Sequence, residues 1–161
     1  MKKVKLYEIS KEPRRFLRTR CTNIPNILDI NLLEDISKRA IATMLHANGC
    51  GLAAPQIGSS LRFVVVKLGE EIIFAINPRI TSFSVAQFVS PEGCLSIPGV
   101  VGVVHRSTKI CVEYTTLNDD ICVRNFSNHY AAIWQHEIDH LNGILFTDIA
   151  LAVWRESIKT L

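Results

Sequence analysis

His136-Glu137-Ile138-Asp139-His140 decides the fold, because it lies in a segment, residues 128–145, with the hydrophobic pattern of a helix. The residues that share one face of this helix are Ala132, Ile133, His136, His140 and Ile144. Residues four apart lie one turn apart, so both imidazoles can point at one metal ion while Glu137 lies beside it. The surrounding apolar residues predict a buried helix, in which two unpaired imidazoles beside carboxylates are costly unless something binds them.

The same five residues match a pattern found in zinc hydrolases, in which two histidines bind the metal and the glutamate handles protons. The alternative is a helix with two incidental histidines, which the apolar frame of the helix disfavours. A catalytic zinc site takes three protein ligands and leaves one position open. The motif therefore predicts a third ligand elsewhere in the chain.

Two acidic residues downstream, Asp148 and Glu156, are candidates for this ligand, but neither has a familiar spacing and no histidine follows His140. Cys94 lies upstream in a segment rich in glycine and proline, and its thiolate is a strong ligand for a borderline-soft cation. Cys94 is the better candidate, with a packed thiol as the alternative.

Residues 49–58 contain three glycines and a proline, which predict an irregular segment that permits close backbone approach. Gln56 in this segment carries an amide that can donate to a developing oxyanion together with a backbone N–H. The alternative for a loop glutamine is simple solvation. Phosphate binding by the glycines is disfavoured, because the P-loop pattern is absent.

The rest of the pattern predicts an α+β fold in which β-sheets pack around the central buried helix that bears the two histidines. Residues 32–47 are expected to form an N-terminal helix, and residues 149–161 a short C-terminal helix. Strands are predicted over residues 62–67, 71–77, 84–89, 100–104, 109–115 and 121–126. Residues 91–99 are expected to form a loop or an edge segment, because prolines and glycines punctuate them.

The composition indicates a single globular domain over residues 1–161, with 48% hydrophobic and 20% charged residues. A net charge of +3 is too small to argue for nucleic acid, and we expect no DNA partner. Five cysteines without a CxxC pair favour reduced thiols and a cytoplasmic or organellar interior. The sequence has no apolar run long enough to predict a membrane span. The locally basic stretch Pro13–Arg20 is either a solvated segment or a patch that faces RNA.

Three segments of the sequence together resemble the motifs of peptide deformylase. They are Gly49-Cys50-Gly51-Leu52-Ala53-Ala54-Pro55-Gln56, Glu92-Gly93-Cys94-Leu95-Ser96 and Gln135-His136-Glu137-Ile138-Asp139-His140. They stand in the order of that family and at similar separations, and residues 141–146 resemble the family's continuation of the third motif. The resemblance extends from about Pro13 to Phe146 and is therefore not carried by one short motif.

The resemblance implies a metal-dependent hydrolase that removes the formyl group from the N-terminal formylmethionine of nascent polypeptides and releases formate. It implies one divalent metal ion per chain, which is Fe²⁺ in the cell, with Zn²⁺, Ni²⁺ or Co²⁺ able to replace it. The implied ligands are Cys94, His136 and His140. Glu137 takes a proton from the attacking water and gives it to the leaving amine, while Gln56 and the backbone N–H of Leu95 hold the oxyanion.

The family's substrate contacts also correspond to residues of this chain. The backbone of Gly51 would pair with the peptide as an added strand. The remaining implied substrate-binding residues are Gly49, Cys50, Glu92, His129, Ala132 and Ile133, of which four line the methionine pocket. The implied partners are formylmethionyl nascent chains, with a transient ribosome contact and no membrane.

Three departures leave parts of the resemblance open. His129 is polar where an apolar residue is common, Val101 stands where many members have arginine, and the tail after Phe146 is short. Two alternatives also remain: a zinc amidase or peptidase with the same helix motif, and a non-catalytic relative that binds modified N-termini. The second would have lost Glu137, Gln56 or a ligand, and all of these are present.

Overall fold

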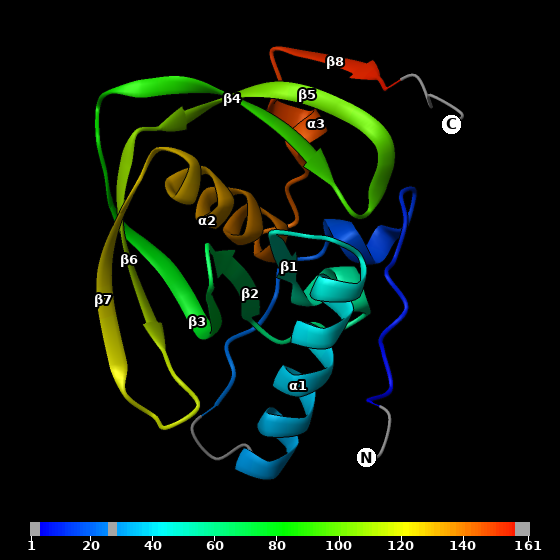
Figure 1. The fold of residues 1–161 in the computed structure, drawn as a ribbon, viewed down its shortest axis with the longest axis vertical. Helices are drawn as coiled ribbons and strands as arrows, with labels where there is room; N and C mark the ends of the chain where they lie inside the picture. Colours follow the sequence, from blue (N-terminus) through cyan, green and yellow to red (C-terminus); the bar gives the residue numbers. More distant parts are fainter. Residues whose placement is uncertain (1–3, 26–28, 157–161) are drawn as a thin grey trace.

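The computed structural model describes residues 4–25 and 29–156 and has two antiparallel sheets and a few helices (Figure 1). The helices are η1 (Arg15–Arg18), α1 (Ile30–His46), η2 (Ala54–Ile57), α2 (Asn128–Leu141) and α3 (Phe146–Ile149). The strands are β1 (Gly51–Ala53), β2 (Phe63–Leu68), β3 (Glu71–Phe83), β4 (Gln87–Cys94), β5 (Ile97–Ser107), β6 (Lys109–Thr115), β7 (Ile121–Ser127) and β8 (Ala152–Arg155). The α+β prediction is confirmed.

Helix α2 lies between the two sheets (Figure 1). The larger sheet has the order β1-β2-β3-β6-β7, and the smaller has the order β4-β5-β8. A tight turn at Gly69 joins β2 to β3, as the sequence predicts, with Leu68 paired to Glu71. The helix contacts strands of both sheets, so its two sides meet different surroundings.

The side of α2 that packs on the larger sheet forms the centre of the core. Trp134 is fully buried, and its ring lies 5.5 Å from that of Tyr114 on β6 and 5.2 Å from that of Phe126 on β7. The helix ends at Leu141, earlier than the 145 expected, because Gly143 adopts a left-handed backbone with φ of 77°. That turn redirects the chain into the separate short helix α3.

Helix α1 begins two residues before the predicted start, because Asp29 caps it by accepting a hydrogen bond from the backbone N–H of Asn31. Its apolar face buries Leu33, Ala40 and Met44. Among residues 4–25 and 29–156, none of the helices combines the length and the apolar character needed to cross a bilayer.

Two predictions about the middle of the chain are partly right. Strand β3 continues to Phe83, and of the predicted strand over 84–89 only residues 87–89 are extended, as the start of β4. Residues 91–99 were expected as a loop or an edge segment, and most of them belong to the β4–β5 hairpin, in which β4 is an edge strand. Pro91 is accommodated because β4 is an edge strand, where a missing N–H disrupts no ladder.

The predicted C-terminal helix over 149–161 is wrong. Residues 152–155 form β8, which pairs with β5 through contacts such as Val101 with Trp154. Residues 157–161 lie outside the described part. The segment 49–58 is more regular than expected, because Gly51–Ala53 pairs with β2 and Ala54–Ile57 forms a short 3-10 helix.

Candidate metal centre and active site

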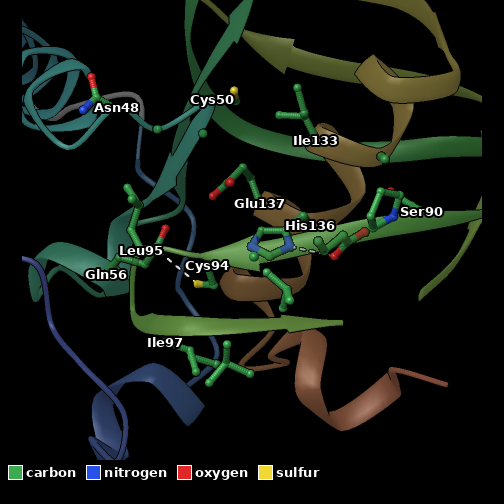
Figure 2. Close-up of a pocket in the computed structure, with 18 of the residues that line it drawn as sticks. Asn48, Cys50, Gln56, Ser90, Cys94, Leu95, Ile97, Ile133, His136 and Glu137 are labelled. Carbon is green, nitrogen blue, oxygen red and sulfur yellow. Dashed lines mark hydrogen bonds and ion pairs between the residues drawn. The ribbon is translucent and has the colours of Figure 1, made fainter. Parts of the chain in front are cut away.

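A cleft of about 390 Å³ opens between β1, the β4–β5 hairpin and α2 (Figure 2). Every residue that the sequence marks for catalysis or substrate binding lines this cleft, and so do two of the three expected ligands. The lining includes Gly49, Cys50, Gly51, Gln56, Glu92, Cys94, Leu95, His129, Ala132, Ile133, His136 and Glu137. His140 is not part of the lining, because it is 1% exposed and lies beneath the floor.

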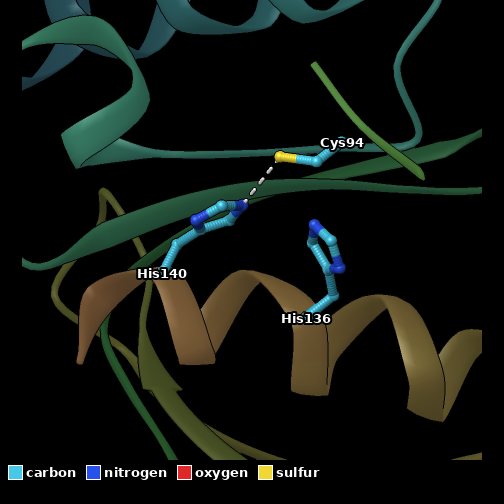
Figure 3. Close-up of side chains that lie close together, drawn as sticks. All are labelled: Cys94, His136 and His140. Carbon is cyan, nitrogen blue, oxygen red and sulfur yellow. Dashed lines mark hydrogen bonds between the residues drawn. The ribbon is translucent and has the colours of Figure 1, made fainter. Parts of the chain in front are cut away.

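Three potential metal ligands meet at the floor of the cleft (Figure 3). Cys94 comes from the end of β4, and His136 and His140 come from successive turns of α2. Their ligand atoms all lie within 4.8 Å of one another, and Cys94 Sγ is 3.3 Å from His140 Nε2. The β4–β5 register shifts between Gly93 and Cys94, and such an irregularity re-aims a side chain.

A buried chain of charged groups orients His136. The Nδ1 atom of His136 lies 2.8 Å from Glu92 Oε2, which leaves Nε2 free to face the cluster. Arg106 donates to both oxygens of Glu92, at 2.7 and 3.0 Å, and to Asp139 at 2.6 Å. A carboxylate bonded to the far nitrogen of a metal-binding histidine fixes its orientation and makes it a better ligand.

The two histidines differ in electrostatic setting. Burial lowers the pKa of His140 to well below its usual range, so its ring is neutral at pH 7. Burial also opposes a charge on His136, but neighbouring Cys94 and Glu92 raise its pKa well above the usual value. The sulfur of Cys94 and the carboxylate of Glu92 therefore make the surroundings of His136 favourable for a positive charge.

The cluster fits a divalent metal ion. Nδ1 of the buried His140 has no hydrogen-bond partner in the part of the chain that the structure describes, so no second group fixes its protonation. One thiol and two imidazoles supply the sulfur and nitrogen donors that suit zinc and similar cations. Three protein donors beside an open cleft match a site that keeps a position for a reactant rather than a closed structural site.

Glu137 points from α2 toward β1 across the cleft (Figure 2). It is 5% exposed, and its Oε2 atom has no partner among the described residues. Burial raises the pKa of this carboxyl to about 7, with the charge of Glu92 adding to the effect and His136 opposing it. A Cβ atom at Gly51 would lie 2.1 Å from Glu137 Oε1, so a larger residue at position 51 would displace this carboxylate.

Gln56 is held rigidly although it was expected in a loop. Its Oε1 accepts from the backbone N–H of Ala53 at 2.8 Å, and its side chain is 2% exposed. Its Nε2 therefore points toward the cluster, 3.2 Å from Ser96 Oγ and 3.5 Å from Cys94 Sγ. Leu95 begins the two-residue turn after Cys94 and also lines the cleft.

Sequence reasoning missed Arg106, Asp139 and Ser96. Arg106 is 4% exposed in an otherwise apolar strand, and an arginine within such a run was the available signal. Glu92, which is expected to contact the substrate, lines the cleft, and both oxygens of its carboxylate are bonded to Arg106, one of them also to His136.

An antiparallel α+β fold with a thiol, two imidazoles and an unpaired glutamate at a cleft is typical of metal-dependent hydrolases. Residues 6–153 match the family model described as polypeptide deformylase. The peptide deformylase of Pelotomaculum thermopropionicum is 43% identical over 147 residues, which cover 90% of this chain and 92% of that protein. The chain belongs to the polypeptide deformylase family, and the resemblance noted from the motifs is confirmed.

Solved structures of relatives share the fold. The peptide deformylase of Thermotoga maritima superposes with a TM-score of 0.87 at 36% identity, covering 92% of this chain and 99% of that one. A class I type b peptide deformylase from Acinetobacter baumannii, solved with Met-Ala-Ser bound, gives 0.86 at 32% identity and covers 91% and 99%. The architecture around the cleft is therefore the family's own.

Proposed function

We propose that this chain, as one catalytic domain over residues 1–161, removes the formyl group from the N-terminal formylmethionine of nascent polypeptides and releases formate. The observation that carries the proposal is the group of Cys94, His136 and His140 beside the unpaired carboxylate of Glu137. Membership in the polypeptide deformylase family supports the choice of substrate and reaction.

Cys94, His136 and His140 would hold one divalent metal ion, which we expect to be Fe²⁺ in the cell, with Zn²⁺, Ni²⁺ or Co²⁺ as substitutes. Such an ion would polarise the formyl oxygen and lower the pKa of a bound water. The chain's own contribution is to arrange the donors, and the bond from Glu92 to His136 Nδ1 keeps the other ring nitrogen aimed at the cluster.

Glu137 would carry the proton. Formamide cleavage requires a base for the attacking water and then an acid for the leaving nitrogen, and one carboxyl can serve both steps. A pKa of about 7 suits this exchange, because neither protonation state is strongly favoured at neutral pH. None of the described residues forms a hydrogen bond with Glu137 Oε2, which leaves that oxygen available to the reactants.

Gln56 and the backbone N–H of Leu95 would stabilise the oxyanion. The hydrogen bonds from Ala53 and to Ser96 hold the Gln56 amide in one orientation before the reaction begins. Preorganised donors of this kind contribute about 2.7–4 kcal/mol each to transition-state stabilisation. Solvation, the alternative reading of Gln56, does not fit a side chain that is 2% exposed.

The peptide would lie along β1 as an added strand, with backbone hydrogen bonds at Gly49 and Gly51. Its methionine would enter the part of the cleft lined by Cys50, His129, Ala132 and Ile133. The Met-Ala-Ser peptide bound to the Acinetobacter baumannii relative supports a ligand of this class. Glu92 would act behind the substrate wall by positioning His136, rather than by touching the peptide.

We place the reaction in a bacterial-type cytoplasm, because formylated chain ends arise there and the relatives named above are bacterial. A transient contact with the ribosome is expected, since the substrate is a nascent chain. The zinc-peptidase alternative needs a downstream ligand, and among the described residues neither Asp148 nor Glu156 belongs to the ligand group. Asp148 also accepts hydrogen bonds from Arg18 and from the backbone N–H of Leu145.

The decisive test is formate release from formyl-Met-Ala-Ser by protein purified without oxygen and loaded with Fe²⁺ or Ni²⁺. We expect release that stops when a chelator removes the metal and returns when the metal is restored. Acetyl-Met-Ala-Ser is the matched control for amide hydrolysis in general. A folded, metal-loaded protein that releases no formate would overturn the proposal and favour a protein that only binds modified chain ends.

A further inference from the structure

A second cavity, of about 300 Å³, has four arginines in its wall. We call it the arginine pocket, and its lining consists of Arg20, Arg62, Arg79, Ile80, Phe83, Arg106, Gln135, Ile138, Asp139 and Asn142. It shares no lining residue with the catalytic cleft. Residues 135, 138 and 139 of α2 and its C-cap residue 142 line the arginine pocket. Residues 132, 133, 136 and 137 of the same helix line the catalytic cleft, so the two cavities open on different sides of α2.

Two of the four arginines are already paired with carboxylates. Arg106 bonds Glu92 and Asp139, and Arg79 forms an ion pair with Glu113 at 2.8 Å. Asp139 is the only acidic residue in the lining. The pocket therefore holds more positive charge than its own acids balance.

The other two arginines, Arg20 and Arg62, have no carboxylate partner among residues 4–25 and 29–156. Arg62 donates only to neutral oxygens: Pro78 O at 3.3 Å, Leu141 O at 3.4 Å and Asn142 Oδ1 at 3.1 Å. Two of these are long for charge-assisted hydrogen bonds. No hydrogen bond or ion pair of the Arg20 side chain exists within the same described residues.

The electrostatic setting of Arg62 favours a bound anion. Burial lowers the pKa of Arg62, Cys21 opposes the shift, and the like charge of Arg20 adds to it. Cys21 does not supply the missing negative charge, because burial raises the pKa of its thiol and keeps it neutral at pH 7. Two adjacent cations, one of them about half-buried, are stabilised when a negative group binds between them.

An aromatic ring lies in the wall of the same cavity. Phe83, at the end of β3, is 58% exposed, which is unusual for a phenylalanine and leaves a ring face available. Arginine forks bind phosphate oxygens in pairs, and exposed aromatic rings stack on nucleobases. The combination matches a ligand with a phosphate at one end and a base at the other.

We propose that the arginine pocket binds a nucleotide phosphate, with Arg20 and Arg62 on the phosphate oxygens and Phe83 against the base. Arg79 and Arg106 keep their carboxylate partners, so the net positive charge of the pocket comes from Arg20 and Arg62. Arg20 belongs to the basic stretch Pro13–Arg20, for which the sequence left a solvated segment and an RNA-facing patch as alternatives. The same chemistry is offered by a free nucleotide and by a nucleotide within an RNA strand.

The test is isothermal titration calorimetry of the metal-loaded protein in low-salt buffer free of phosphate. The probes are AMP, adenosine, and a 5′-phosphorylated tri-adenylate. We expect saturable binding of AMP that weakens as salt is raised, and no binding of adenosine. Tighter binding of tri-adenylate than of AMP would identify an RNA strand as the source, and equal binding would identify a free nucleotide; both results support the site.

The variants are chosen to leave the fold and the catalytic cleft intact. Arg20→Gln should weaken AMP binding about fivefold to tenfold, and Phe83→Ala should weaken it by a similar factor. Arg15→Gln removes the same charge from the same basic stretch but lies outside the pocket, so it should bind AMP like the wild type. Absence of AMP binding at millimolar concentration, or equal loss in Arg20→Gln and Arg15→Gln, would overturn the proposal.

Discussion

The two sides of helix α2 differ in the kind of side chain that they bury. The side toward the larger sheet is apolar and fully packed, with Trp134 between Tyr114 and Phe126. Among the described residues, Glu137 Oε2 and His140 Nδ1 on the side toward the cleft are buried without a hydrogen-bond partner, and so is the indole Nε1 of Trp134 on the packed side. The two groups toward the cleft are titratable, whereas the indole is not. One helix can therefore pack into the core with one face and hold buried, titratable groups with the other.

The buried carboxylate of Glu137 has a raised pKa and destabilises the fold. Packing of the opposite side of α2 compensates for this cost by holding the helix in place. Substitutions on the cleft side should therefore reduce activity with little loss of stability. Substitutions on the packed side should do the reverse.

The largest effect is expected for Glu137→Ala. Loss of this buried carboxylate, whose Oε2 has no partner among the described residues, should lower kcat by about a thousandfold or more, since general acid–base catalysis contributes about 10²–10⁴-fold. The melting temperature should stay the same or rise, because an unpaired buried group disappears. Formate assays, metal analysis and thermal unfolding would be compared. A variant that keeps the wild-type rate would remove Glu137 from the mechanism.

Trp134→Ala probes the packed side. Truncating a fully buried tryptophan should lower the free energy of unfolding by about 3–5 kcal/mol, through lost burial and the cavity left behind. Protein that remains folded should still bind one metal ion. Tyr130→Ala is the matched control on the same helix, because Tyr130 is 41% exposed and should cost little. Similar losses in both variants would mean that the core is not centred on Trp134.

Arg106→Gln tests the charged chain behind His136. Glu92 would lose both hydrogen bonds from the guanidinium, and His136 would be held less firmly. We expect about a 10–100-fold loss of metal affinity, measured by competition with a chelator on the folded fraction. Arg79→Gln, which breaks only the exposed pair with Glu113, should leave metal affinity unchanged. Unchanged affinity in Arg106→Gln would show that orientation of His136 does not depend on this chain.

The smallest effect is expected at the exposed ion pair between Glu71 and Arg124. The hydrogen bonds from Arg124 lower the pKa of Glu71, with burial acting the other way. The pair therefore contributes stability above the ordinary glutamate pKa, and this contribution is lost as pH falls through the lowered value. Glu71→Gln should cost less than about 1 kcal/mol near neutral pH and nothing in acid, as denaturant titrations at several pH values would measure. A pH-independent difference would contradict this assignment.

The sequence predicts the elements that local patterns determine, but not those that depend on contacts between distant parts of the chain. The helix with His136 and His140 and the strand Lys109–Thr115 were predictable, because their hydrophobic periods are visible in the local sequence. Strand β8 was not, because residues 149–161 carry no strong period and pairing with β5 decides their structure. The sequence left a loop and an edge segment as alternatives for residues 91–99, because Pro91 is tolerated only at a sheet edge and the tertiary fold decides where that edge lies.

The candidate site divides in the same way. Motif residues could be named in advance, because their chemistry and spacing are visible along the chain. The bonds from Arg106 to Glu92 and Asp139 could not, because they join residues that are 14 and 33 positions away through the register of β4 on β5 and the packing of α2.

The central claim is that Cys94 and the two histidines of α2 share one metal ion. X-ray absorption at the zinc edge of zinc-loaded protein, measured for the wild type and for Cys94→Ser, tests it most directly. We expect one sulfur and two imidazole nitrogens around zinc in the wild type, and loss of the sulfur signal in the variant. A wild-type spectrum without sulfur, or an unchanged spectrum in Cys94→Ser, would contradict it.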